Sequence, residues 1–401
     1  AVADLVDNSI TAGASNVRID LAFDGARSWI RIADDGSGMS PKRITEALRY
    51  GSDETYGTRD LGKFGLGLKT ASMSQCRRLT VASRTRRGPV SIRRLDLDHV
   101  TQSNRWEIAD IAADDQRLNI SSSSGTVVLW ESLDRVLQYK DPDGEWARAG
   151  LRALADRTDQ HLGMVLHRFL DGSARRPNVL KLMINGTQVD AWDPFARDEP
   201  ATTEHDSGDV YLVTPTQAGM VRYGGWVLPP REKFSSEVAF RRAGGPKKWN
   251  RQQGFYIYRA DRMIQSGGWS WMRTADEHTK LARMSIDFLP ELDGAFGINV
   301  AKVRVTLPAE LRDHLAAPVA SLVKAAQAAY RDKAASDQRS GSKRPVGDGS
   351  ASQPSGGNGD VSELAMTLRS AAEKVKEEAA LGKIAEQVRR DSPEVARAIG
   401  W

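Results

Sequence analysis

The sequence opens with two polar side chains one helical turn apart, Asp4 and Asn8, which together could serve a metal ion and a water molecule. At about 100° per residue, Asp4, Asn8 and Thr11 share one face of a helix, opposite an apolar face made of Val2, Leu5, Val6 and Ile10. The amide oxygen of Asn8 suits Mg²⁺, and the carboxylate of Asp4 can polarise a nucleophilic water. A solvated polar face is the commoner meaning of this spacing, so the interpretation depends on the rest of the chain.

A second polar segment, residues 34–39, reads Asp-Asp-Gly-Ser-Gly-Met. It follows two alternating stretches, 17–21 and 28–32, that we expect to form a β-hairpin. Glycines at the third and fifth positions permit tight turns and the close approach of a flat ligand. Asp34 offers an acceptor to an exocyclic amine. The segment is therefore a candidate base-binding loop, with an ordinary turn as the alternative.

A third segment combines glycine and lysine immediately before an expected helix. Three glycines fall within six residues: Gly62, Gly65 and Gly67. Bare backbone N–H groups and the positive start of the helix would bind phosphates, with Lys63 and Lys69 as counter-charges. The spacing is not that of a Walker loop or a dinucleotide fingerprint, and a glycine-rich turn without a ligand is the alternative. Residues 50–61, just upstream, are polar and glycine-spaced, and we expect a mobile lid there.

Composition places these segments in a sizeable globular protein. The chain has 401 residues, 40% hydrophobic and 27% charged, which is enough for two domains and further segments. The single cysteine, Cys76, excludes an intramolecular disulfide and fits a reducing, cytoplasmic location. No apolar run reaches membrane-spanning length, so we expect a soluble protein without membrane contact. Because the chain begins without Met inside an expected helix, we also expect a preceding segment.

The remaining patterns predict an α+β protein with two strand-rich regions. Strands are expected at 78–83, 90–97, 125–130, 179–187, 210–213, 254–259, 286–288 and 298–305. Helices are expected over 145–169 and from Pro308 to about Tyr330. Residues 335–359 have the composition of a flexible linker, and 360–401 the pattern of an amphipathic helical segment.

Positive charge is clustered although the net charge is only +5. One run combines five cations with nearby tryptophans, Trp269 and Trp271. Its cations are Arg241, Arg242, Lys247, Lys248 and Arg251. Phosphate-binding charge beside stacking groups is typical of contacts with nucleic acid. A solvated basic loop with core tryptophans fits the sequence equally well.

The order of these segments resembles the GHKL ATPase superfamily of gyrase, heat-shock chaperone, histidine kinase and MutL proteins. Asp4 with Asn8, the loop 34–39, the lid, the glycine segment and Gly125-Thr126 follow one another as in that family. The resemblance covers about residues 1–330. Within the superfamily, the chain looks most like the MORC branch and its bacterial relatives.

The resemblance implies a Bergerat-type α/β sandwich ATPase domain over 1–170, followed by a transducer domain with a mixed sheet and helices over 171–334. The flexible linker 335–359 and the C-terminal helical segment 360–401 would follow. ATP and Mg²⁺ are the implied ligands, and the protein would form a homodimer when ATP is bound. Nucleotide state would then set the domain geometry through differential contacts.

Each motif carries over a role from the family. Asn8 would ligate Mg²⁺, Asp34 would take the adenine amino group, and Thr126 would complete the adenine side. The base pocket would be shaped by Gly36, Gly38 and Met39. The phosphates would be approached by Gly62, Lys63, Phe64, Gly65, Leu66, Gly67 and Lys69. Lys302, at the matching transducer position, would reach the γ-phosphate, with a solvated strand-edge lysine as the alternative.

The family's general base, normally Glu, falls at Asp4. The shorter side chain pulls the carboxylate back by roughly an ångström, and a catalytic hydrogen bond tolerates little misplacement, so we expect slow hydrolysis. Action on DNA in genome maintenance or defence is the first expectation. An ATP-switched DNA clamp or scaffold with negligible turnover and a chaperone-like ATPase are the alternatives. A histidine kinase is disfavoured because all six His follow the first three motifs, and a zinc enzyme because no Cys/His cluster exists.

Overall fold

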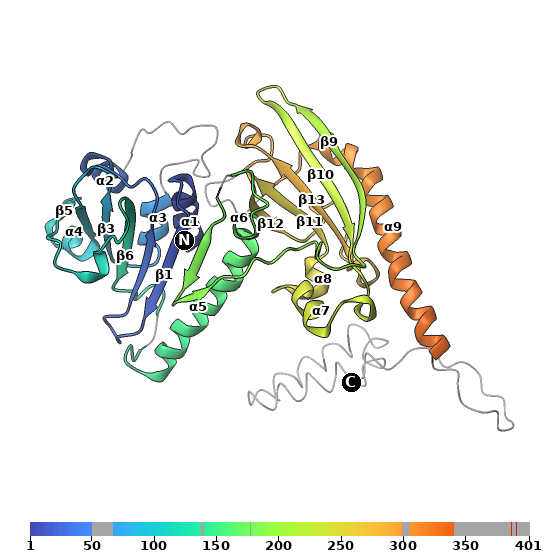
Figure 1. The fold of residues 1–401 in the computed structure, drawn as a ribbon, viewed down its shortest axis with the longest axis horizontal. Coiled ribbons are helices and arrows are strands. Elements are labelled where there is room, and N and C mark those ends of the chain that lie inside the picture. The colour runs from blue at the N-terminus through green and yellow to red at the C-terminus, as the bar shows by residue number, and fades with distance from the viewer. Residues whose placement is uncertain are drawn as a thin grey trace. The chain divides into compact units, whose positions relative to one another are not determined.

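The computed structural model describes residues 1–49, 67–137, 140–176, 178–298 and 305–340, together with Glu386 and Arg390. The contact pattern separates Ala1–Arg339 from Ser340–Trp401, and the first of these units contains two sheets (Figure 1). The expected lid and most of the expected C-terminal segment lie outside the described residues. No helix among the described ranges is long and apolar enough to cross a membrane.

The first sheet has eight described strands in the order β5-β4-β3-β6-β2-β1-β7-β8. They are β1 (Asn16–Ala22), β2 (Trp29–Asp34), β3 (Arg78–Arg84), β4 (Ser91–Asp96), β5 (Ala109–Asp110), β6 (Gly125–Glu131), β7 (Lys181–Ile184) and β8 (Thr187–Gln188). Neighbours pair antiparallel, except that β7 runs parallel to β1. The alternating apolar residues of β1 and β2, such as Ile19 and Ile32, are buried on one face, as their spacing predicts.

Helices pack on that buried face and close the larger core. They are α1 (Val2–Thr11), α2 (Pro41–Leu48), α3 (Gly67–Met73), α5 (Glu145–Val165) and α6 (His167–Asp171). The Ser40 hydroxyl accepts from the Arg43 N–H at 3.3 Å and caps α2, whose start at Pro41 the sequence predicts. The same core includes Tyr256 and Tyr258 of the second sheet, so the two sheets share buried apolar surface.

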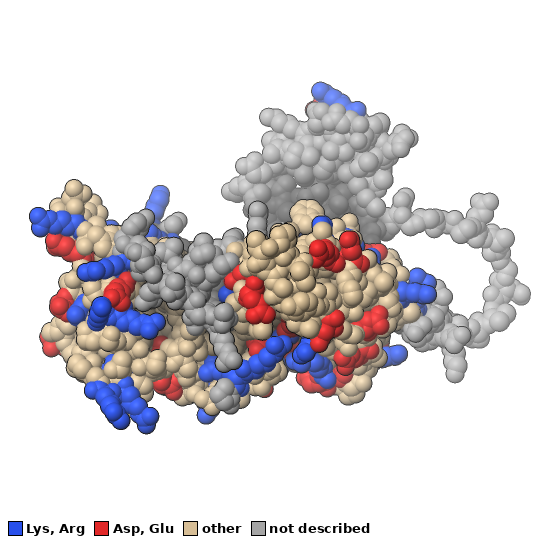
Figure 2. All heavy atoms as spheres, turned by 90° about the horizontal axis from the view of Figure 1, so that it is seen from above, with Lys and Arg blue, Asp and Glu red and all other residues tan. Residues whose placement is uncertain are grey.

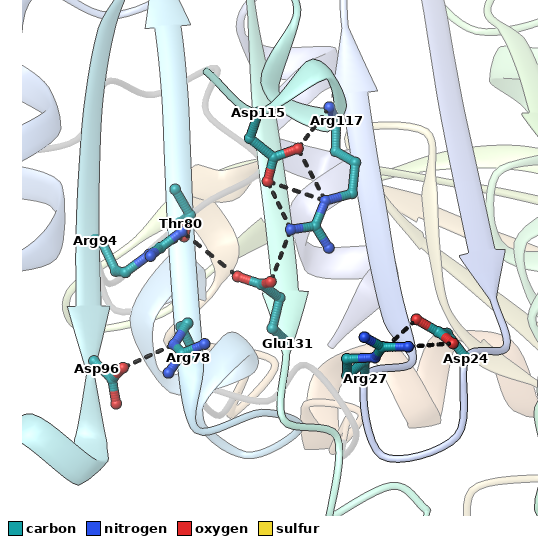
Figure 3. Close-up of polar contacts among 9 residues, drawn as sticks. All are labelled: Asp24, Arg27, Arg78, Thr80, Arg94, Asp96, Asp115, Arg117 and Glu131. Atoms are coloured by element: carbon teal, nitrogen blue, oxygen red, sulfur yellow. Dashed lines mark hydrogen bonds and ion pairs between the residues drawn. The ribbon is translucent and has the colours of Figure 1, made fainter. Parts of the chain in front are cut away.

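The opposite face of the first sheet carries a smaller core and a network of ion pairs (Figure 3). The core consists of Ala82, Ile92, Leu118, Ile120, Val127 and Leu129. Beside it, Glu131 on β6 pairs with Arg117 at 2.9 Å and with Arg94 at 3.7 Å. Arg117 also pairs with Asp115 at 2.6 Å. These contacts hold the short helix Gln116–Leu118 against the sheet. A further helix, α4 (Leu97–Ser103), directly follows β4 in the chain.

The second sheet has five described strands in the order β12-β11-β13-β10-β9. They are β9 (Thr203–Val213), β10 (Ala218–Val227), β11 (Gly254–Arg259), β12 (Arg262–Ser266) and β13 (Ala282–Phe288), with β11 and β13 parallel. The helices of this region are α7 (Glu237–Gly244), α8 (Lys248–Gln252) and α9 (Ala309–Ser340). Leu311, Leu315 and Leu322 of α9 are buried in the second core. The predicted α+β class, with a sheet-rich second region, is confirmed.

The sequence analysis did not predict β10, β12, α7 or α8, and most of the strand expected over 298–305 lies outside the described residues. Three predicted elements have other bounds or partners than expected. β7, expected to open the second strand-rich region, pairs with β1 and extends the first sheet. The helix expected over 145–169 breaks at Leu166, which brings His167 of α6 to 2.9 Å from the Tyr258 hydroxyl. Finally, α9 continues to Ser340, whereas the linker was expected from residue 335, because a helix that is alanine-rich over residues 316–335 propagates readily into the residues that follow. The domain boundaries themselves stay predictions.

Candidate nucleotide site

Asp34, the last residue of β2, accepts hydrogen bonds from three separate segments. Its Oδ1 accepts from the backbone N–H of Gly36 at 2.9 Å and of Thr126 at 3.2 Å, and its Oδ2 accepts from the Ser9 hydroxyl at 3.0 Å. Burial raises the pKa of Asp34, and these hydrogen bonds oppose that rise. A carboxylate offers about four lone-pair positions, so within the described part of the chain one position on Oδ2 remains for a further donor.

The turn that follows Asp34 requires glycine at two positions. Gly38 has a φ of +68°, and a methyl group there would overlap the carbonyl oxygen of Arg84. A Cβ at Gly36 would lie 2.8 Å from the Cβ of Ala12. The two glycines therefore allow the turn, the end of α1 and the end of β3 to approach one another closely.

Ser83 on β3 joins this turn to β6. Its hydroxyl accepts from the Met39 N–H at 2.8 Å and lies 2.9 Å from both the Gly125 carbonyl oxygen and the Thr126 hydroxyl. Thr126 stands opposite Asp34 in the β2–β6 pairing and opposite Ser83 in the β3–β6 pairing. The structure thus brings the predicted residues Asp34, Met39 and Thr126 together.

The helix α1 carries the two predicted metal-site residues on its accessible side. Asn8 is exposed and the Asp4 side chain is 33% exposed, whereas Leu5 and Val6 are buried. The hydrogen bond from Ser9 to Asp34 places the same helix beside the Asp34 turn. The predicted amphipathic helix is therefore present, and it adjoins the candidate base-binding loop.

A buried ion pair joins α1 to the second sheet. The Asp7 carboxylate accepts from Arg262 Nε at 2.8 Å, and both side chains are almost fully buried. The sequence analysis singled out neither residue, nor Ser9 or Ser83. Their types and spacing carry no local signal, because each acts through a partner from a distant segment.

The predicted phosphate-binding segment is described from Gly67, where α3 begins. Lys69 is buried, its ammonium group donates to the Arg49 carbonyl oxygen, and burial lowers its pKa. The other predicted residues of the segment lie outside the described residues: Gly62, Lys63, Phe64, Gly65 and Leu66. Lys302 also lies outside them. The phosphate roles of all these residues stay predictions.

The predicted basic run is partly engaged in contacts within the chain. Arg241 pairs with Glu237 at 3.2 Å, and Lys247 donates to the Ser266 hydroxyl at 2.8 Å. Arg242 donates to the Ala191 carbonyl oxygen at 2.6 Å. Elsewhere, on the face drawn in Figure 2, lysine and arginine side chains are interspersed with acidic ones over the described surface.

Other groups near the run are free to meet a partner. Lys248 and Arg251 are exposed, and Trp271 is fully exposed on a backbone with a φ of +68°. Trp269 is 3% exposed and belongs to the second core, so Trp269 is a core tryptophan, as the alternative interpretation of the sequence held.

Comparison with known proteins identifies the N-terminal part of the chain. The family model of histidine kinase-, DNA gyrase B- and HSP90-like ATPases matches residues 1–126, the range that holds α1, the Asp34 turn and Thr126. Residues 1–126 belong to the GHKL superfamily. The resemblance seen in the motifs is confirmed for this range.

The GHKL domain is also similar to proteins named DNA mismatch repair protein MutL. The one from Azorhizobium caulinodans is 37% identical over 93 residues, which are 22% of this chain and 15% of the relative. The one from Coxiella burnetii is 36% identical over 105 residues, 24% of this chain and 18% of the relative. The one from Aeromonas hydrophila is 42% identical over 91 residues, 21% of this chain and 14% of the relative. The chain therefore matches less than a fifth of the length of these relatives.

The described residues of the GHKL domain fit ATP and Mg²⁺. The remaining acceptor position of Asp34 Oδ2 suits the exocyclic amine of adenine. Asn8 presents an amide oxygen to solvent from the neighbouring helix, as a ligand for a hard cation requires.

Proposed function

We propose that the chain binds ATP with Mg²⁺ and hydrolyses it slowly. The observation that supports this best is the Asp34 carboxylate, which three donors hold in place with one acceptor position to spare, next to the exposed Asn8 of α1. The ATPase family of the GHKL domain supplies the reaction type.

Each residue has a stated role in this proposal. Asp34 accepts the adenine amine, Asn8 provides an oxygen ligand to Mg²⁺, and Asp4 orients the attacking water. When bound, Mg²⁺ would neutralise part of the negative charge on the phosphates. Lys302 and the glycine segment would contact the phosphates, as the family resemblance implies.

Phosphate release by the wild type, Asp4→Ala and Asp4→Glu tests the hydrolytic part. Because a positioned general base contributes about 100-fold or more, Asp4→Ala should lower turnover about 100-fold, and Asp4→Glu should raise it by restoring the reach of the carboxylate. Asp4 is partly exposed, so neither change should disturb the fold. ATP binding with no phosphate release in any of the three proteins would contradict hydrolysis and favour the alternative, an ATP-switched clamp or scaffold.

We further propose that ATP binding closes the domains and forms a homodimer. The shared core between the first sheet and the second sheet supports coupling, because both sheets would respond to a change at α1. The native mass of the chain, measured with and without a non-hydrolysable ATP analogue, should double. An unchanged mass would contradict this part and leave nucleotide binding intact.

We propose DNA as the partner, in genome maintenance or defence, because the named relatives are DNA mismatch repair proteins and the second region exposes two cations, Lys248 and Arg251, and the side chain of Trp271. Neutralising Lys248 and Arg251 together should weaken retention on duplex DNA. The plot of the logarithm of the binding constant against the logarithm of the salt concentration should become less steep by about 2, since each phosphate contact contributes about 0.9 to its slope. Neutralising the exposed Arg86 and Arg87 of the GHKL domain is the matched control. Equal effects of the two double variants would contradict a specific surface. A chaperone-like role and membership of the MORC branch stay secondary proposals.

A further inference from the structure

The ion pair between Asp7 and Arg262 connects residues 255 positions apart in the sequence. Its side chains are 1% and 9% exposed, and Arg262 also donates to the backbone carbonyl oxygen of Met263. Met263 itself is fully buried in the core shared by the two sheets. The guanidinium group is therefore fixed by its own strand, and it in turn fixes the carboxylate on α1.

Asp7 lies beside the face of α1 that carries Asp4 and Asn8, so its ion pair with Arg262 affects the orientation of both residues. At 3.6 residues per turn, Asp7 lies about 60° from Asp4 and about 100° from Asn8 around the helix axis. Asp7 therefore borders the polar face that carries both residues. A helix held at this edge cannot rotate about its axis without breaking the pair, so the pair sets the directions in which Asp4 and Asn8 point.

Stability alone gives little reason for such a pair. Removing two charges from water costs roughly what their attraction returns, and well-packed apolar residues often replace a buried pair without loss. What a hydrogen-bonded guanidinium adds is a fixed direction for the carboxylate. The apolar contacts of Leu5, Val6 and Ile10 hold α1 against the sheet, whereas two polar contacts, Asp7 with Arg262 and Ser9 with Asp34, define its rotation.

Arg262 lies on β12, the edge strand of the second sheet. The second sheet has another attachment to the helices of the larger core, where Arg168 of α6 pairs with Asp261 at 3.2 Å and with Asp287. Asp261 directly precedes Arg262, so both attachments meet at the β11–β12 turn. A displacement of this turn would reach α1 through the Asp7–Arg262 pair.

We propose that Arg262 is a positioning residue which, through Asp7, aims Asn8 at Mg²⁺ and Asp4 at the attacking water. This inference rests on the proposed ATP site. Arg262 contacts α1 through Asp7, and it would act on metal binding in the way that outer-shell partners do, whose loss typically lowers metal affinity about 10- to 100-fold.

Calorimetric titration with ATP, in Mg²⁺ and in EDTA, measures how much Mg²⁺ tightens binding. In Arg262→Gln this gain should fall about tenfold, because Asn8 is misdirected. Affinity in EDTA should stay within about threefold of the wild type, because the N–H groups of Gly36 and Thr126 hold Asp34 independently of α1. The matched control is Arg283→Gln, which removes an equally buried guanidinium group that donates to the Ala243 carbonyl oxygen at 2.6 Å. Arg283 on β13 is opposite Gly254, at the far end of β11 from the β11–β12 turn, so Arg283→Gln should lose stability but keep the full Mg²⁺ gain.

Two further variants keep the test informative if Arg262→Gln folds poorly. Arg262→Lys retains the buried charge but not the guanidinium geometry, and it should lose part of the Mg²⁺ gain at nearly wild-type stability. Asp7→Asn, which changes the other end of the same ion pair, should also lose part of the Mg²⁺ gain.

Three results would overturn the inference. One is an unchanged Mg²⁺ gain in both Arg262→Gln and Arg262→Lys. Another is an equal loss of the gain in Arg283→Gln and Arg262→Gln, which would indicate a general effect of destabilisation. The absence of ATP binding in the wild type would overturn the proposed function and this inference together, whereas ATP binding with an unaltered gain in the variants would overturn the inference alone.

Discussion

Replacing Asp34 with asparagine is expected to weaken ATP binding by about 10- to 100-fold. A hydrogen bond to a charged group contributes roughly 1.5–3 kcal/mol, and each 1.4 kcal/mol is about tenfold in affinity. The wild-type carboxylate accepts from the adenine amine with the position left on Oδ2, whereas an amide directs an N–H group toward that amine. Equilibrium titration of the purified variant with ATP measures the loss.

The fold should survive this change. The remaining amide oxygen can still accept from the N–H groups of Gly36 and Thr126, and the amide N–H can donate to the Ser9 hydroxyl. GTP, which carries an oxygen in place of the amine, should bind the wild type weakly and lose little affinity in the variant. An Asp34→Asn protein that is folded and binds ATP as tightly as the wild type would exclude Asp34 from the base pocket.

The pH dependence of ATP binding follows from the same group. Burial raises the pKa of Asp34 above the ordinary value of 3.8, and protonation removes the acceptor. As the pH falls, wild-type affinity should therefore begin to drop at a higher pH than an ordinary aspartate would cause. The Asp34→Asn protein should lack this part of the drop, which separates it from titration of the ATP phosphates.

Replacing Gly38 with alanine is expected to lower the free energy of unfolding by about 2–5 kcal/mol. A left-handed conformation costs a residue with a Cβ about 1–2 kcal/mol. The new methyl group would also overlap the Arg84 carbonyl oxygen, and relief of such overpacking costs about 1–3 kcal/mol more. Urea denaturation followed by circular dichroism measures the change.

Gly186→Ala separates the two contributions. Gly186 has a φ of +81° and nothing within 4 Å of an added Cβ, so only the backbone cost of about 1–2 kcal/mol applies. A Gly38→Ala protein no less stable than Gly186→Ala would contradict the close approach of the Asp34 turn to β3.

Sequence reasoning located the parts of the site that depend on local rules. The amphipathic spacing of α1 follows from the helical repeat, and the Asp-x-Gly-x-Gly turn follows from glycine's access to positive φ. The register of β2, β3 and β6 then brings Asp34 and Thr126 together, as the order of the motifs implied.

The contacts between distant segments were beyond that reasoning. Ser83 joins the turn to β6 only because three strands meet there, and a serine in an apolar strand gives no sign of this. Asp7 reads as one more acidic residue on a polar helix until Arg262 is placed opposite it. β7 was assigned to the second region because a strand sequence does not reveal whether its partner is β1 or a later strand.

Titration of the chain with ATP in the presence of Mg²⁺, with EDTA as the comparison, decides whether α1 and the Asp34 turn form a nucleotide site. We predict saturable binding of one ATP per chain, tightened by Mg²⁺ and weakened at least tenfold by Asp34→Asn. Absence of saturable ATP binding to the folded wild-type chain, or binding that Asp34→Asn and Asn8→Ala both leave unchanged, would contradict it.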